Sequence, residues 1–157
     1  MTELWELNAR EQIRQTVWSY AVAGDSGRMD ELAAQFTADG VLEVDGKERA
    51  EGRAAIIAML TRHAAAGAPP AGALPADSPP FFIRHFVTNI AIQSVTAAEA
   101  HGVAYFAVFT PAGPDHWGRY RDVFVPDGDR WLLRQRTARV DSSVEGGWYR
   151  RTFAARG

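Results

Sequence analysis

Hydrophobic positions in the first half of the chain recur with helical spacing. Residues 7–23 mix apolar and polar side chains at that spacing, which predicts an amphipathic helix, and Gly24 is expected to end it. A short second helix is expected at Arg28–Phe36 and a third at Gly52–His63. The apolar stripe of the first helix consists of Ile13, Val17, Tyr20 and Ala21.

The second half of the chain has the pattern of β-strands. A first strand is expected earlier, at Val41–Val44, where the turn pair Asp45-Gly46 stops it. Four longer segments rich in β-branched and aromatic residues follow, separated by turn residues. They are Phe81–Val95, Ala100–Thr110, Trp117–Val125 and Arg130–Asp141. Helices first and antiparallel strands second predict an α+β domain, with the helices on one face of a curved sheet.

Two segments fall outside this pattern. Residues 67–80 hold five of the eight prolines and are predicted to be a loop, of a length that is usually functional or disordered. The C-terminal tail, residues 143–157, carries three aromatic residues after Gly146-Gly147. It either closes the mouth of a cavity, packs into a neighbouring subunit or packs on the surface of its own chain. The length of the chain is that of a single domain spanning residues 1–157.

Composition narrows the classes of function. A net charge of −2 gives no general attraction to nucleic acid or to an anionic membrane. The chain has no cysteine, which excludes disulfides, thiolate nucleophiles and cysteine-ligated metals. No apolar run approaches the ~18 residues of a membrane span, and the first residues do not resemble a signal peptide. A cytoplasmic protein is therefore expected. The four histidines are scattered without metal-ligand spacing, so no metal is expected.

His85 interrupts an otherwise apolar strand, Phe81–Ile92. A buried imidazole without a hydrogen-bond partner would cost ~1–3 kcal/mol, and histidine is the side chain that exchanges protons near neutral pH. In a regular strand, His85, Val87 and Asn89 share one face. This pattern fits either a core histidine held by hydrogen bonds or the wall of a pocket with a few polar groups.

Asp25 and the Tyr120–Asp122 segment are the other candidates. Asp25 directly follows the first helix, where it either caps the second helix or serves as a carboxylate for general acid–base work. Asp122 is expected to form a cross-strand ion pair with Arg136. Tyr120 lies on the same side of its strand as Asp122, as a buried phenol or as a donor in a pocket.

Taken in order, these features resemble the SnoaL-like branch of the NTF2-like superfamily, from about Glu11 to Asp141. The resemblance implies a cone in which a curved antiparallel sheet wraps about three N-terminal helices and an apolar cavity opens at one end. Relatives include scytalone dehydratase, steroid isomerase and polyketide cyclases, most of which need no cofactor. The landmarks are Tyr20-Ala-x-x-x-Asp25, Leu32-Ala-x-x-Phe36-Thr-x-Asp39-Gly-Val41, Gly52-Arg-x-Ala-Ile56, Arg84-His85-x-x-x-Asn89, Gly118-x-Tyr120-x-Asp122 and Trp131-x-x-x-x-Arg136.

The resemblance also assigns roles. Asp25 matches the aspartate of the dehydratase type and His85 its partner histidine. Gly24 stands where the dehydratase has a tyrosine, and Ala104–Phe106 stands where it has a second cavity histidine. The remaining site candidates are donors to a substrate oxygen (Tyr20, Tyr105 and Tyr120), a pocket amide (Asn89) and apolar walls (Trp18, Phe86 and Trp117).

The expected function is a cofactor-independent lyase or isomerase for a small hydrophobic, aromatic or polycyclic molecule. Two alternatives stay open. One is an accessory or ligand-binding subunit like the small subunit of a dioxygenase, in which Asp25 and His85 form a structural pair. The other is epoxide hydrolysis by Asp25, Asp122 and Arg136. The resemblance further implies a homodimer or homotrimer formed through the outer face of the sheet. From the charge and composition, no nucleic-acid or membrane partner is expected.

Overall fold

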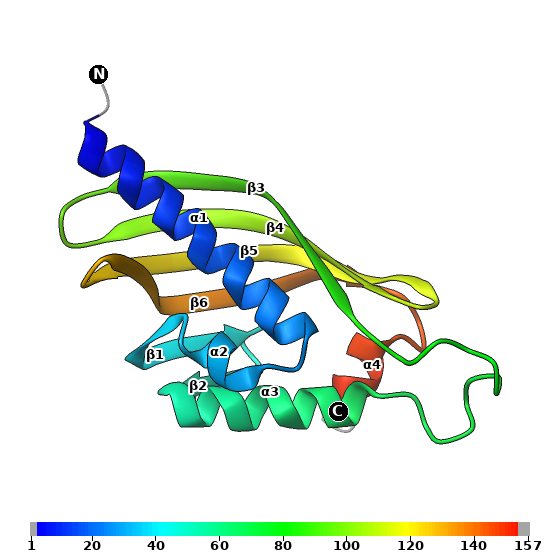
Figure 1. The fold of residues 1–157 in the computed structure, drawn as a ribbon. Coiled ribbons are helices and arrows are strands. Elements are labelled where there is room, and N and C mark those ends of the chain that lie inside the picture. Colours follow the sequence, from blue (N-terminus) through cyan, green and yellow to red (C-terminus); the bar gives the residue numbers. More distant parts are fainter. Residues whose placement is uncertain (1–2, 154–157) are drawn as a thin grey trace.

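The computed structural model describes residues 3–153 and shows helices packed on one curved sheet (Figure 1). The helices are α1 (Leu4–Asp25), α2 (Met29–Ala33), α3 (Arg53–Gly67) and α4 (Trp148–Phe153). The strands are β1 (Phe36–Val44), β2 (Glu48–Glu51), β3 (Arg84–Val95), β4 (Ala100–Thr110), β5 (Gly113–Asp127) and β6 (Arg130–Ser143). The α+β architecture is therefore as the sequence predicts.

The six strands lie in the order β2-β1-β6-β5-β4-β3. Every neighbouring pair is antiparallel except β1 and β6, which run parallel. The sheet is thus mixed, which corrects the prediction of a wholly antiparallel one. The four long strands follow one another through tight turns, so they pair antiparallel. The chain between β1 and β6 instead passes through α3 and the other strands, and a parallel pair requires such a long connection.

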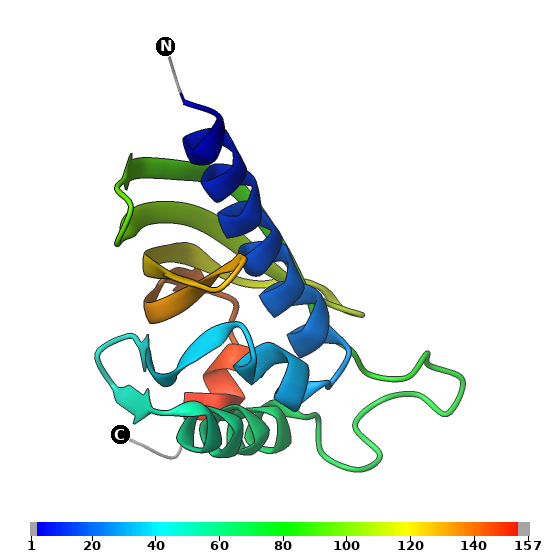
Figure 2. The same cartoon turned by 60° about the vertical axis from the view of Figure 1, so that its left-hand side comes forward.

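The helices cover one face of the sheet. In Figures 1 and 2, α1 runs diagonally across the strands, while α3 lies beyond the β1–β2 edge. The predicted stripe of α1 is buried and packs against residues from β1, β5 and β6, among them Phe36, Phe124 and Leu133. Burying one such side chain is worth ~1.5–3 kcal/mol. This contact fixes the direction of α1, and therefore the place where the helix ends.

A β-bulge in β3 changes which residues face the helices. The register with β4 shifts between Thr88 and Ala91, and Asn89 adopts a left-handed conformation with φ of 51°. Because of the extra residue, the next side chain after Val87 that packs on the core is Ile90, three residues later instead of two. Asn89 is therefore exposed and does not share a face with His85, which corrects the prediction made for a regular strand.

Several boundaries differ from the prediction. Helix α1 continues past Gly24 and ends at Asp25. The short elements β2 and α4 were not predicted, and α4 lies within the C-terminal tail, whose residues 154–157 are outside the described chain. Residues 68–83 contain no helix or strand and project beside α4 (Figure 1).

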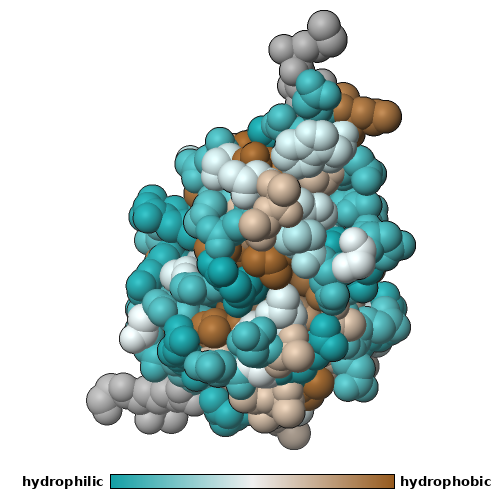
Figure 3. All heavy atoms as spheres, turned by 90° about the vertical axis from the view of Figure 1, so that its left-hand side faces the viewer, coloured by the Kyte–Doolittle hydropathy of each residue, from teal (hydrophilic) through white to brown (hydrophobic). Residues whose placement is uncertain are grey.

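The face on the left in Figure 1 is mostly hydrophilic, with scattered apolar side chains (Figure 3). None of the helices in residues 3–153 has the length and apolar character needed to cross a membrane.

Candidate active site

Asp25 and His85, 60 residues apart in sequence, meet at two points. His85 Nδ1 lies 2.6 Å from Asp25 Oδ1, and the backbone N–H of His85 donates to Asp25 Oδ2 at 2.9 Å. Both carboxylate oxygens are therefore engaged by one residue. A ring that is held at Nδ1 and at its own backbone has a fixed position relative to the acid.

The end of α1 brings the acid to the start of β3. Asp25 is the last residue of α1, and Arg84 donates from Nη1 to the Asp25 carbonyl at 3.1 Å, which satisfies one of the open carbonyls at the helix end. Helix α2 has no side-chain hydrogen bond at its N-cap. Asp25 therefore pairs with His85 and does not cap α2.

The pairing sets the chemistry of the imidazole. An ionised carboxylate only accepts hydrogen bonds, so the proton shared with Asp25 belongs to Nδ1. Within residues 3–153, Nε2 of His85 has no hydrogen-bond partner. The side chains of His85 and Asp25 are 20% and 11% exposed, so the pair is sheltered but reachable. Such a ring can take a proton at Nε2 and return it.

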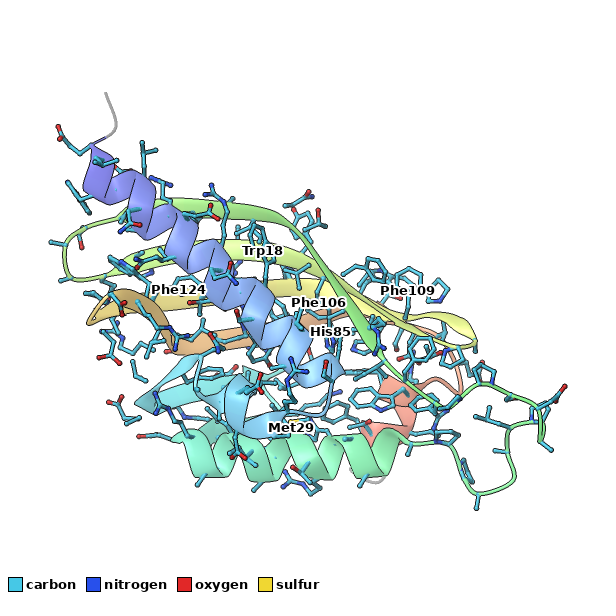
Figure 4. The ribbon with its side chains drawn as sticks, in the orientation of Figure 1. Trp18, Met29, His85, Phe106, Phe109 and Phe124 are labelled. Atoms are coloured by element: carbon cyan, nitrogen blue, oxygen red, sulfur yellow. The ribbon has the colours of Figure 1, made fainter. Side chains whose placement is uncertain are left out.

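Both members of the pair line a cavity of about 280 Å³. It lies where α1 ends, between α2, α3, residues 81–83 and α4. His85 is seen near this end of α1 in Figure 4. Its apolar walls include Met29, Leu32, Leu60, Phe81, Ile83 and Trp148. The volume is at the small end of the usual range for ligand sites, which suits a molecule of one or two rings.

Tyr20 supplies a phenol to the same cavity. The Arg136 guanidinium lies over two tyrosine rings, 4.3 Å from the centre of Tyr20 and 4.0 Å from that of Tyr120. Burial raises the pKa of Tyr20, and the opposing positive charge of Arg136 does not cancel this effect. The phenol therefore stays protonated at neutral pH and can donate a hydrogen bond. Tyr120 is buried against Phe106 and does not line the cavity.

Arg136 and Asp122 form the predicted cross-strand pair. Their bidentate contacts measure 2.9 and 2.7 Å, and both side chains are buried. Neither residue lines the cavity that holds Asp25. The three side chains needed for epoxide hydrolysis are therefore not arranged around one space, and the pair is a structural one.

His63 is a cavity residue that the sequence analysis did not identify. It lies in α3, is buried, and lines the cavity together with Leu60 and Ala64. Its Nε2 is 2.9 Å from Oε2 of Glu48 in β2. A signal was present in the sequence, because His63 follows Ile56 and Leu60 at helical spacing and so continues the buried stripe.

Asp115 and His116 position the Trp148 wall. The carboxylate of Asp115 accepts hydrogen bonds from the backbone N–H groups of Trp148 and Tyr149 at 2.5 and 3.0 Å, and from His116 Nδ1 at 2.8 Å. Burial opposes the ionised form of Asp115, but these three donors outweigh it and lower its pKa. The bare Gly67 at the end of α3 leaves room for the Trp148 ring.

His116 lies in the same cross-strand row as His85, with Val108 of β4 between them. Its ring stacks on Trp148 with an interplanar angle of 12°, and burial lowers its pKa. The β4 stretch Ala104–Phe106 indeed carries no histidine. An imidazole two strands from His85 was missed because the hairpin register is not visible in sequence.

The other five candidates lie outside the cavity, which corrects their prediction as walls and donors. Trp18 is 42% exposed and borders a hollow on the outside of α1 and α2. Phe86, Tyr105 and Trp117 are 60%, 53% and 41% exposed on the outer face of the sheet. Phe86 points outward because it follows His85, and Trp117 because it follows His116. Asn89 is exposed at the bulge.

Among the described residues, no group of three or more histidine and acidic side chains is placed to hold a metal ion.

Comparison with known proteins gives a consistent picture. A family model described as a SnoaL-like domain matches residues 5–137. No curated protein sequence matches the chain.

Many solved structures are similar to this one. A protein from Catenulispora acidiphila is 28% identical, with a TM-score of 0.70, over 84% of this chain and 91% of that one. A proposed scytalone dehydratase from Novosphingobium aromaticivorans is 20% identical, with a TM-score of 0.68, over 87% and 86%. ActVI-ORFA from Streptomyces coelicolor is 21% identical, with a TM-score of 0.67, over 84% and 96%.

Proposed function

This chain belongs to the SnoaL-like domain family, and we propose that it is a cofactor-independent acid–base enzyme of the dehydratase, isomerase or cyclase type. Its fold is the NTF2-like cone, and the family includes enzymes such as scytalone dehydratase and polyketide cyclases. The observation that carries the proposal is an imidazole that is fixed by a carboxylate and lines an apolar cavity.

The geometry supports the following proton transfer. His85 Nε2 removes a proton from a carbon next to a substrate carbonyl, and the electron pair of that bond moves to form an enolate. Tyr20 donates a hydrogen bond to the developing oxyanion. The resulting imidazolium is stabilised by Asp25 and returns its proton to another carbon or to a departing hydroxyl. A positioned acid–base group of this kind accelerates proton transfer ~10²–10⁴-fold.

The cavity favours a catalytic role over that of an accessory subunit. In a purely structural pair, aromatic side chains would fill the space around the imidazole. Here the aromatic residues Phe81 and Trp148 are walls of an open space that Asp25 and His85 also line. The size of this space and its apolar walls favour a small aromatic substrate of one or two rings.

Proton exchange in heavy water tests the proposal with a simple probe. 2-Indanone has acidic protons beside its carbonyl and fits the proposed substrate size. We expect the protein to accelerate exchange of these protons, measured by proton NMR. His85→Ala should lower the rate ~10²–10⁴-fold, and Asp25→Asn should lower it as well because a neutral amide does not stabilise the positive charge of the imidazolium.

The matched control is His101→Ala. His101 is exposed and pairs with Glu99 at 2.6 Å, outside the cavity, so its loss should leave exchange unchanged. Wild-type exchange rates in both the His85→Ala and Asp25→Asn proteins, with cooperative unfolding retained, would contradict the assignment.

A further inference from the structure

A second imidazole in the cavity is held by a second carboxylate. Glu48 Oε2 lies 2.9 Å from His63 Nε2 and 2.8 Å from Nη2 of Arg62. The side chains of His63 and Glu48 are each 7% exposed. The acid comes from β2 and the imidazole from α3, so the contact ties the edge of the sheet to the helix. The position of the His63 ring is fixed in the same manner as that of His85.

The ion pair with Arg62 determines which nitrogen of His63 carries the proton. Oε2 of Glu48 accepts a hydrogen bond from Arg62, and the same oxygen is placed to accept from the imidazole. The proton on the neutral ring is therefore on Nε2. Burial, with a smaller contribution from the positive charge of Arg62, lowers the pKa of His63 to about 4. At neutral pH the ring is uncharged, and Nδ1 is an acceptor.

This acceptor has no partner within the described residues, although His63 lines the cavity. Most of the neighbouring wall is apolar, including Leu60, Ala64 and Trp148. A polar atom in such surroundings gains most from a ligand that donates a hydrogen bond. The lone pair of Nδ1 therefore selects for a hydroxyl group, or another donor, on the bound molecule.

His63 and His85 belong to different sides of the site. Helix α3 packs on α2 and α4, whereas β3 packs against α1 and β4. Helix α2, which packs on α3, contributes Met29 and Leu32 to the wall of the same cavity. A small flat molecule that spans this space presents one end to each imidazole.

We propose that His63 is a second substrate-contacting residue, whose Nδ1 accepts a hydrogen bond from a hydroxyl group at the end of the substrate remote from His85. Glu48 and Arg62 are positioning residues that act through the ring. The inference rests on the proposed function in that the same cavity receives the substrate, and it defines the substrate class. The molecule carries its reacting carbonyl at one end and a hydrogen-bond donor at the other.

Two probes that differ by one hydroxyl test this assignment. 2-Indanone and 5-hydroxy-2-indanone share the carbonyl end, and the second carries a hydroxyl on the remote ring. Dissociation constants measured by titration calorimetry should show that the wild-type protein binds the hydroxylated probe about tenfold more tightly, the effect of one additional hydrogen bond. Equal affinity, or no measurable binding of either probe, would overturn the proposal.

Substitutions show which residue causes the preference for the hydroxylated probe. His63→Phe keeps a ring beside Phe153, which lies 5.1 Å from the imidazole centre, but removes both nitrogens. The preference, taken as the ratio of the two dissociation constants in the same variant, should fall to about onefold. In Glu48→Gln, the side-chain amide can donate to Nε2, so the ring proton can move to Nδ1. This substitution should therefore also reduce the preference. Glu99→Gln, beside exposed His101, is the matched control and should leave the preference unchanged. A tenfold preference that survives His63→Phe would overturn the proposal.

The same probes separate this inference from the proposed function. His85→Ala should abolish proton exchange yet retain the preference for the hydroxylated probe, because Tyr20 still holds the carbonyl end. A preference that depends on His63, without any exchange, would support the hydroxyl site and contradict the enzyme. Proton exchange without a preference for the hydroxylated probe would support the enzyme and contradict the hydroxyl site.

Discussion

Three imidazoles on the inner side of this fold are each held by a carboxylate: His85 by Asp25, His63 by Glu48, and His116 by Asp115. In each contact one ring nitrogen is used, so the acid determines what the other nitrogen can do. His85 and His63 line the cavity, whereas His116 lies beneath Trp148. A histidine–carboxylate pair can therefore serve proton transfer, substrate binding or packing, depending on whether the second ring nitrogen faces the cavity.

Burial of His63 predicts a pH-dependent stability. Its pKa is about 4 in the folded protein, against 6.5 for an unperturbed histidine. The unfolded chain therefore binds the proton first. The contribution of neutral His63 to the free energy of unfolding should be complete above pH 6.5 and should be lost as the pH falls toward 4. The slope should not exceed ~1.4 kcal/mol per pH unit.

Urea unfolding of the wild type and His63→Phe between pH 4 and 7 measures this effect, because the other titrating groups are common to both proteins. The stability difference between the two should change through this window. A constant difference would show that the proton affinity of His63 is the same in the folded and unfolded chains.

At the scale of elements, strand β5 holds the short helix α4 in place. Helix α4 has six residues and forms few internal hydrogen bonds, so an isolated copy would not be stable. Asp115 of β5 accepts the N–H groups of Trp148 and Tyr149 at its start. Arg151 donates to the carbonyl of Gly67, which anchors the helix to α3. These contacts place the Trp148 wall of the cavity.

Removing the carboxylate should therefore detach α4. We expect Asp115→Ala to lower the free energy of unfolding by about 2 kcal/mol, because it leaves buried donors without an acceptor. Amide exchange at Trp148 and Tyr149 should accelerate at the same time. Asp129→Ala, in the exposed turn between β5 and β6, is the control and should change stability by less than ~0.5 kcal/mol. Unchanged exchange at both amides in Asp115→Ala would contradict this account of α4.

The sequence predicts long elements well and short ones poorly, for physical reasons. Helix α1 and the strands β3–β6 are long enough for their periodicity to be visible. Strand β2 and helix α4 are formed by their neighbours, and such contacts leave no periodic signal. The bulge at Asn89 could not be predicted either, because the surrounding fold determines that this asparagine adopts the left-handed conformation.

The candidate site follows the same division. Asp25 and His85 could be identified because each belongs to a long element and the order of features resembles a known family. His63 was not identified as a site residue because its partner, Glu48, lies in the unpredicted strand β2. The candidates Phe86 and Trp117 failed because each directly follows an inward-facing histidine in its strand, so that the alternation of side chains turns it to the outer face.

At the scale of the whole molecule, the outer face of the sheet carries an exposed aromatic patch. It consists of the exposed Phe86, Tyr105 and Trp117 and the half-buried Phe109, from β3, β4 and β5. Phe86 and Phe109 pack edge to face with centres 5.0 Å apart. Clustered exposed aromatic residues of this kind mark interaction surfaces.

We expect copies of the chain to associate through this patch as a dimer or trimer. Light scattering after size-exclusion chromatography should give a mass above 17.2 kDa, the mass of one chain. The double substitution Phe86→Asp, Trp117→Asp should reduce it to that of a monomer, because it places charges in the apolar contact. Trp5→Asp, an exposed aromatic position on α1, is the control. A wild-type monomer at high concentration would rule out the interface.

The reacting pair and the cavity walls occupy different parts of the chain. Asp25 and His85 are fixed where α1 meets the hydrogen-bonded start of β3, whereas Met29, Leu60 and Ile83 come from two other helices and a segment without regular structure. This division lets evolution alter selectivity while leaving the chemistry intact. A laboratory library confined to those three positions should accordingly yield variants with altered ligand preferences more often than inactive ones.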